Sequence, residues 1–113
     1  SDTVAVAHPE QVRQVFRLAR NELLGVELSA HFHGRPDDWH VNILAALEAG
    51  CRRFDGATGG LGGCPFAQDH LVSNVPTEGL VELLEEHGFE CVLNEQKLRE
   101  CAKLARELQA KYA

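Results

Sequence analysis

Apolar residues recur at helical spacing in four segments of this 113-residue chain. In the first segment Val12, Phe16 and Ala19 fall on one face, three or four residues apart. Each segment begins at a proline or at a residue that can cap a helix, and the first three are followed by a glycine. The pattern therefore predicts helices from Pro9 to Leu24, from Asp37 or Asp38 to Ala49, from Pro76 to His87, and from Asn94 to Leu108.

Two shorter segments between these helices have the composition of strands, one from Val26 to His33 and one from Cys51 to Asp55. Each follows a helix after a brief link through glycine. Two successive helix-to-strand steps of this kind are typical of βαβ units. We therefore expect an α/β fold with a parallel sheet. Residues 66–74 should form a short helical turn and a loop that ends at Asn74.

A histidine pair stands near the end of the first predicted strand. Residues two apart on a strand point to the same face, so the α-carbons of His31 and His33 should be about 6.6 Å apart. Both imidazoles can then reach one metal ion at a bond length of about 2.1 Å. The same pair is also compatible with one histidine in a local hydrogen bond and one in solvent. Asn74 has a side-chain oxygen that suits a hard divalent cation, although turn asparagines are common.

Half of the residues from Gly56 to Pro65 are glycine, and this segment presents one cysteine, Cys64. Glycine tolerates positive φ, so such a loop can move and carry a thiol over a nearby site. We therefore interpret Gly59, Gly60, Gly62 and Gly63 as a lid loop. Alternatively, the glycines form a fixed turn and Cys64 is buried as a small apolar residue.

The formal net charge of −6 and the absence of a basic cluster argue against nucleic-acid and anionic-membrane partners. No apolar run approaches the ~18 residues that a membrane span needs. The four cysteines form no CxxC pair, which favours reduced thiols. We therefore expect a soluble protein in the cytoplasm or an equivalent reducing compartment.

The motifs together resemble the C-terminal part of the hydroxymethylglutaryl-CoA lyase family. The resemblance rests on His31-Phe32-His33, on Asn74, and on the run from Asp55 to Ala67 that contains Gly-Leu-Gly-Gly-Cys-Pro. Gly34-Arg35-Pro36 after the second histidine makes the chain look more like a bacterial branch of lyase-like proteins, in which the acyl group can differ.

The resemblance implies a function and a set of site residues. This family cleaves 3-hydroxy-3-methylglutaryl-CoA to acetyl-CoA and acetoacetate with a divalent Mg or Mn ion. At the matching positions of this sequence, the resemblance makes His31, His33 and Asn74 metal ligands and Cys64 the mobile catalytic thiol. It also makes Asp2 and His31 catalytic residues. The thiol would protonate the thioester enolate after a reverse aldol step.

The resemblance also implies a fold that this chain only partly supplies. The family's fold is the TIM barrel, which needs about 250 residues and eight strands, whereas residues 1–113 provide about three βα units. We therefore expect a single partial domain that is inactive without the N-terminal half of the barrel or a mate in a homo-oligomer. Two alternatives remain: a non-catalytic fragment or assembly module, and a zinc site built from His31, His33 and Cys64.

Overall fold

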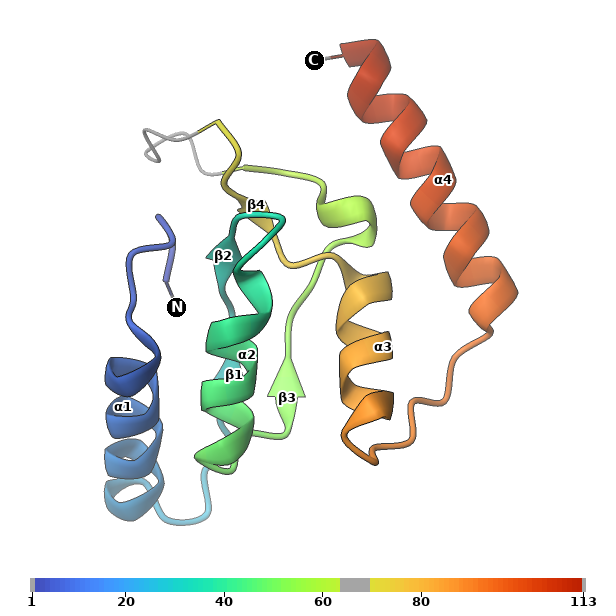
Figure 1. The fold of residues 1–113 in the computed structure, drawn as a ribbon. Helices are drawn as coiled ribbons and strands as arrows, with labels where there is room; N and C mark the ends of the chain where they lie inside the picture. The colour runs from blue at the N-terminus through green and yellow to red at the C-terminus, as the bar shows by residue number, and fades with distance from the viewer. Residues whose placement is uncertain (1, 64–69, 113) are drawn as a thin grey trace.

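The computed structural model describes residues 2–63 and 70–112, which form an α/β arrangement with short strands (Figure 1). The four predicted helices are present, and their ends differ from the predicted ones by a few residues. The helices are α1 (Pro9–Glu22), α2 (Trp39–Glu48), α3 (Thr77–Glu86) and α4 (Glu95–Tyr112), and the remaining elements are β1 (Ser29–Ala30), β2 (His33–Gly34), β3 (Arg53–Phe54), the 3-10 helix η1 (Thr58–Gly60) and β4 (Ser73–Asn74).

The strands pair in two different senses. β1 and β3 are parallel, as the sequence predicts, but β2 and β4 are antiparallel. Asp2 and Phe32 form an isolated parallel bridge, and so do Ala57 and Pro76. The predicted single strand from Val26 to His33 was therefore wrong: it is divided into β1 and β2, which have different partners. The predicted loop ending at Asn74 was also wrong at its end, because residues 73–74 pair with β2 as β4.

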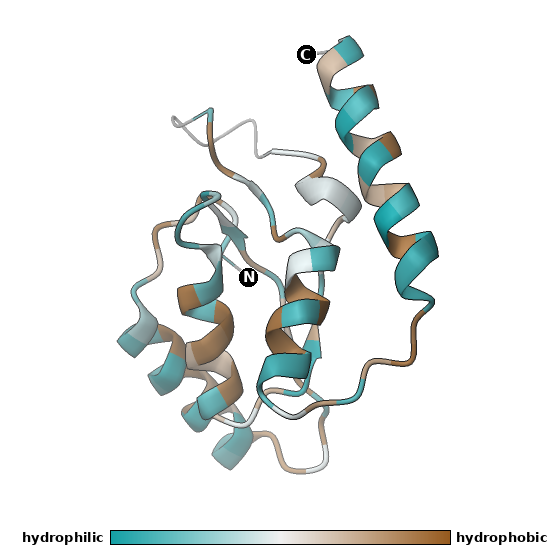
Figure 2. Cartoon of the chain, turned by 45° about the vertical axis from the view of Figure 1, so that its right-hand side comes forward, coloured by the Kyte–Doolittle hydropathy of each residue, from teal (hydrophilic) through white to brown (hydrophobic). Residues whose placement is uncertain are grey.

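The core lies between helix α2 and the short strands. Ile43 and Val75 are completely buried, and Cys51 is nearly so. They pack with Val12 of α1 and Leu80 of α3, so three helices share one apolar cluster. Figure 2 shows hydrophobic residues concentrated on α2 and α3, whereas α4 is largely hydrophilic. None of the described helices is both long enough and apolar enough to cross a membrane.

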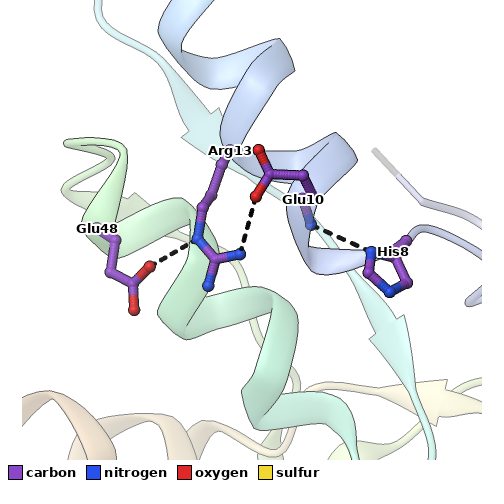
Figure 3. Close-up of polar contacts among 4 residues, drawn as sticks. All are labelled: His8, Glu10, Arg13 and Glu48. Atoms are coloured by element: carbon purple, nitrogen blue, oxygen red, sulfur yellow. Dashed lines mark hydrogen bonds and ion pairs between the residues drawn. The ribbon is translucent and has the colours of Figure 1, made fainter.

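Polar contacts cap α1 and join it to α2 (Figure 3). His8 caps α1 by accepting a hydrogen bond from the backbone N–H of Glu10 at 3.4 Å. The Arg13 guanidinium donates to Glu48 of α2 at 2.7 Å and also lies 3.4 Å from Glu10. Of these two ion pairs only Arg13–Glu48 joins α1 to α2, and because it is exposed it adds little stability. The other face of α1 leaves Val15 and Leu18 more than 60% exposed, at 63% and 62%.

Candidate active site

The structure brings the two predicted histidines together. His31 lies in the link between β1 and β2, and His33 is the first residue of β2. Their ring centroids are 5.2 Å apart with an interplanar angle of 70°. The two imidazoles therefore face one region, although the uniform strand that predicted this geometry is absent.

Asn74 joins the same region from β4, because it is the direct partner of His33 in the antiparallel ladder. Residues opposite one another on such a ladder project to the same face, with β-carbons about 4.5–5.5 Å apart. The Asn74 amide nitrogen donates to the carbonyl oxygens of Leu61 and Gly62 at 2.8 and 3.1 Å. Because both bonds use the nitrogen, they fix the amide and leave Oδ1 as an available acceptor.

Asp2 is buried, with 8% of its surface exposed, and it borders the histidines through its backbone. Its N–H donates to the carbonyl of His31, and its carbonyl accepts the N–H of His33. The carboxylate accepts the backbone N–H groups of Val6 and Ala7 at 3.1 and 2.9 Å. Asp2 thus holds the turn that leads into α1, and a catalytic role for its carboxylate stays a prediction.

An acidic partner of His31 was missed in the sequence analysis. The Nδ1 atom of His31 lies 3.4 Å from Oδ2 of Asp55. The parallel register pairs Ala30 with Phe54, so the next residues on the two strands, His31 and Asp55, adjoin at the strand ends. The only signal in the sequence was that Asp55 ends the second predicted strand and that His31 lies near the end of the first. Asp55 orients His31 with Nδ1 toward the carboxylate.

His33 is more enclosed than His31. Only 9% of His33 is exposed, and its Nδ1 atom is buried without a hydrogen-bond partner among the described residues. Nε2 is not one of the buried unpartnered atoms. We therefore assign Nε2 as the nitrogen through which His33 can meet a ligand.

The donor set fits a divalent ion. Two adjacent imidazoles and an amide oxygen are donors that first-row divalent ions accept, and the amide oxygen also suits magnesium. In the part of the chain that the structure describes, no three His, Cys, Asp or Glu side chains form a metal-binding group. The remaining ligands would therefore come from solvent, substrate or other parts of the protein.

The described glycines of the predicted lid are closely packed against their neighbours. Gly59 has φ +66°, and a β-carbon there would lie 2.8 Å from the β-carbon of Ala105 in α4. Its N–H donates to Glu78 at 3.0 Å. A β-carbon on Gly62 would meet the Asn74 amide at 2.9 Å, and Gly60 and Gly63 approach backbone oxygens of β4 and its flank equally closely. These glycines let the loop approach α4 and β4 more closely than any residue with a β-carbon would allow. The predicted movement of the lid stays a prediction.

Among the described cysteines, Cys51 is buried, Cys91 is partly exposed and Cys101 is exposed. Cys64 lies outside the described residues, so its role and the zinc alternative that uses it remain predictions. Cys51 is buried, and its thiol donates to the carbonyl of Arg53 at 3.1 Å. Burial raises the pKa of the Cys51 thiol, so this cysteine is a structural residue.

A family model described as HMGL-like matches residues 1–105. The chain belongs to the HMGL-like family. It is 34% identical over 110 residues to the hydroxymethylglutaryl-CoA lyase YngG of Bacillus subtilis, a match that covers 97% of this chain and 36% of that protein. It is 38% identical over 88 residues to the (R)-citramalyl-CoA lyase of Chloroflexus aurantiacus, covering 78% of this chain and 27% of that protein.

A solved structure agrees with this assignment. An HMG-CoA lyase from Acinetobacter baumannii, in complex with coenzyme A and 3-methylmalate, superimposes with a TM-score of 0.77 at 38% identity. The match covers 88% of this chain and 32% of that one. This chain is therefore an α/β piece that matches lyases of the family, and it spans about a third of the length of the relatives that it matches.

Proposed function

We propose that this chain is the C-terminal part of a TIM-barrel lyase that cleaves a carbon–carbon bond in a 3-hydroxyacyl-CoA. The observation that carries the proposal is the convergence of His31, His33 and Asn74 beside the β2–β4 pair. Family membership supports the reaction class, since matched relatives act on hydroxymethylglutaryl-CoA and citramalyl-CoA.

His31, His33 and Asn74 would hold a divalent Mg or Mn ion. Such an ion, when bound, lowers the pKa of a hydroxyl that it contacts and orients the substrate. The chain's own residues prepare this site. Asp55 orients His31, the carbonyls of Leu61 and Gly62 orient Asn74, and burial holds the His33 ring in place. A preorganised donor set of this kind loses less free energy when it binds its ligand.

Cys64 is proposed as the acid that delivers a proton to the thioester enolate after bond cleavage. The described part of its loop is anchored to β4 and α4 by the close contacts of the glycines. Substrate cleavage by a reverse aldol step leaves the enolate of acetyl-CoA, which needs one proton. A thiol next to the site can supply it and be reprotonated from solvent.

This chain spans about a third of the length of the relatives that it matches, which supports the proposal that the remainder of a barrel covers it. Val15 and Leu18 project from α1 into solvent, although α1 packs its other face on α2. In a complete barrel, neighbouring helices and strands would bury this apolar surface. We expect the isolated chain to lack activity for this reason and because ligands from the other part are missing.

The decisive experiment compares the complete protein and the isolated chain with hydroxymethylglutaryl-CoA and citramalyl-CoA in the presence of Mn²⁺. We expect turnover of at least one thioester by the complete protein, loss of turnover in Cys64→Ser, and none by the isolated chain. Inactivity of the complete protein on both thioesters would contradict the proposed reaction. A complete protein that binds no metal and only self-associates would favour the assembly module.

A further inference from the structure

A cavity of about 140 Å³ lies beside His33, between β2, the segment that leads into α1 and the first turn of α2. His33, Asp38, Asn42 and Ala5 are among the residues that line it. Two of its lining side chains carry a buried polar atom without a partner in the described part of the chain: Nδ1 of His33 and Oδ1 of Asn42. A buried polar atom without a hydrogen-bond partner is costly, and since both residues line the same cavity, one shared partner would satisfy both atoms.

The orientation of Asn42 decides which partner is possible. Its amide nitrogen donates to the carbonyl oxygen of Ala7 at 3.0 Å. Rotating the amide would place Oδ1 against that carbonyl, which has no hydrogen to give. Oδ1 is therefore fixed as the unpartnered acceptor of the amide, and its partner must be a donor.

Asn42 is itself held by the residues that surround His33. The Asp2 carboxylate accepts the N–H of Ala7, whose carbonyl accepts the Asn42 amide, and the Asp2 carbonyl accepts the N–H of His33. Ala5, within the same turn, is held at a φ of +57°, which is costly for alanine. Hydrogen bonds thus connect His33 to Asn42 through Asp2 and Ala7. A partner shared by the two side chains would connect them a second time, on the side of the cavity.

We propose that Asn42 is a positioning residue that fixes the tautomer of His33 through a single water in this cavity. Nδ1–H of His33 donates to the water oxygen, and the water donates one hydrogen to Oδ1 of Asn42. The cavity is large enough, since a water occupies about 30 Å³ in the liquid. The proton then resides on Nδ1, and Nε2 is the bare nitrogen that points to the candidate metal site.

The tautomer is measured in the complete protein with ¹⁵N-labelled histidine, by long-range ¹H–¹⁵N NMR. A chelator is present, and the pH is about 1.5 units above the unperturbed histidine value of ~6.5. We expect His33 to be protonated on Nδ1. Asn42→Leu should abolish this preference, whereas the same change at the exposed Asn21 of α1 should not. If Asn42→Leu does not fold, the tautomer of His33 in the unaltered protein decides the question by itself.

Only the identity of Nε2 as the metal ligand rests on the proposed function. The NMR measurement is made without metal, so it fails or succeeds separately from the activity assay. In a second measurement, Asn42→Leu should weaken Mn²⁺ binding about 10–100-fold, as loss of an outer partner of a ligating histidine typically does. A proton on Nε2 in the unaltered protein, or an unchanged tautomer in Asn42→Leu, would overturn the inference.

Discussion

Replacing Gly62 by alanine tests whether the glycine loop fixes Asn74. Gly62 has φ +87°, and an added β-carbon would lie 2.9 Å from the Asn74 amide nitrogen. The backbone conformation alone costs alanine about 1–2 kcal/mol. The contact adds a second cost, because the amide must turn away and lose its bonds to Leu61 and Gly62, which contribute about 0.5–1.5 kcal/mol each.

The free energy of unfolding should therefore fall by about 2–5 kcal/mol, measured by urea denaturation of the complete protein. Gly25→Ala is the matched control, since Gly25 has φ +76° and no atom within 4 Å of the added carbon. That variant should show the backbone cost alone. In an Asn74→Ala background the additional cost at Gly62 should disappear. Equal destabilisation by the two glycine changes would refute the proposed contact.

Three further predictions concern the core and the buried polar groups. Ile43→Ala should lower the free energy of unfolding by about 2–5 kcal/mol in urea denaturation, because Ile43 is completely buried. Asp2→Ala should lower it by about 2–4 kcal/mol by the same assay, because two backbone N–H groups lose an ionised acceptor. Cys51 should react with a thiol reagent far more slowly than the exposed Cys101. Burial raises the pKa of the Cys51 thiol, so the folded state favours the neutral thiol. The stability that the buried thiol contributes is therefore complete below the unfolded-state pKa of about 8.5 and is lost as pH rises through the folded-state pKa. Unfolding measured as a function of pH would detect this loss.

The helices were predictable because their signals are local. Periodicity and flanking glycines located α1, α2 and α3 to within two residues. α4 extends four residues beyond Leu108 to Tyr112, because Gln109-Ala110-Lys111 continues a run of good helix formers without a stop signal. Each of these elements depends on residues that are close in the sequence.

The strand pairing and the outer residues of the site depend on contacts that the sequence alone could not reveal. The division of residues 26–33 follows from two different pairing partners, one 24 residues away and the other about 40. The contact of Asn42 with Ala7 spans 35 residues. The histidine pair was found because its spacing is local, whereas Asp55 and Asn42 became visible only when distant segments were placed side by side.

The most direct test of the central claim is Mn²⁺ binding by the complete protein, followed by electron paramagnetic resonance. The unaltered protein should bind Mn²⁺, and His33→Ala should lose that binding while its unfolding transition remains cooperative. His40→Ala, which removes a histidine of α2 outside the proposed ligand set, is the matched control and should bind as the unaltered protein does. Equal affinity of His33→Ala and the unaltered protein for Mn²⁺ would contradict the assignment of this site.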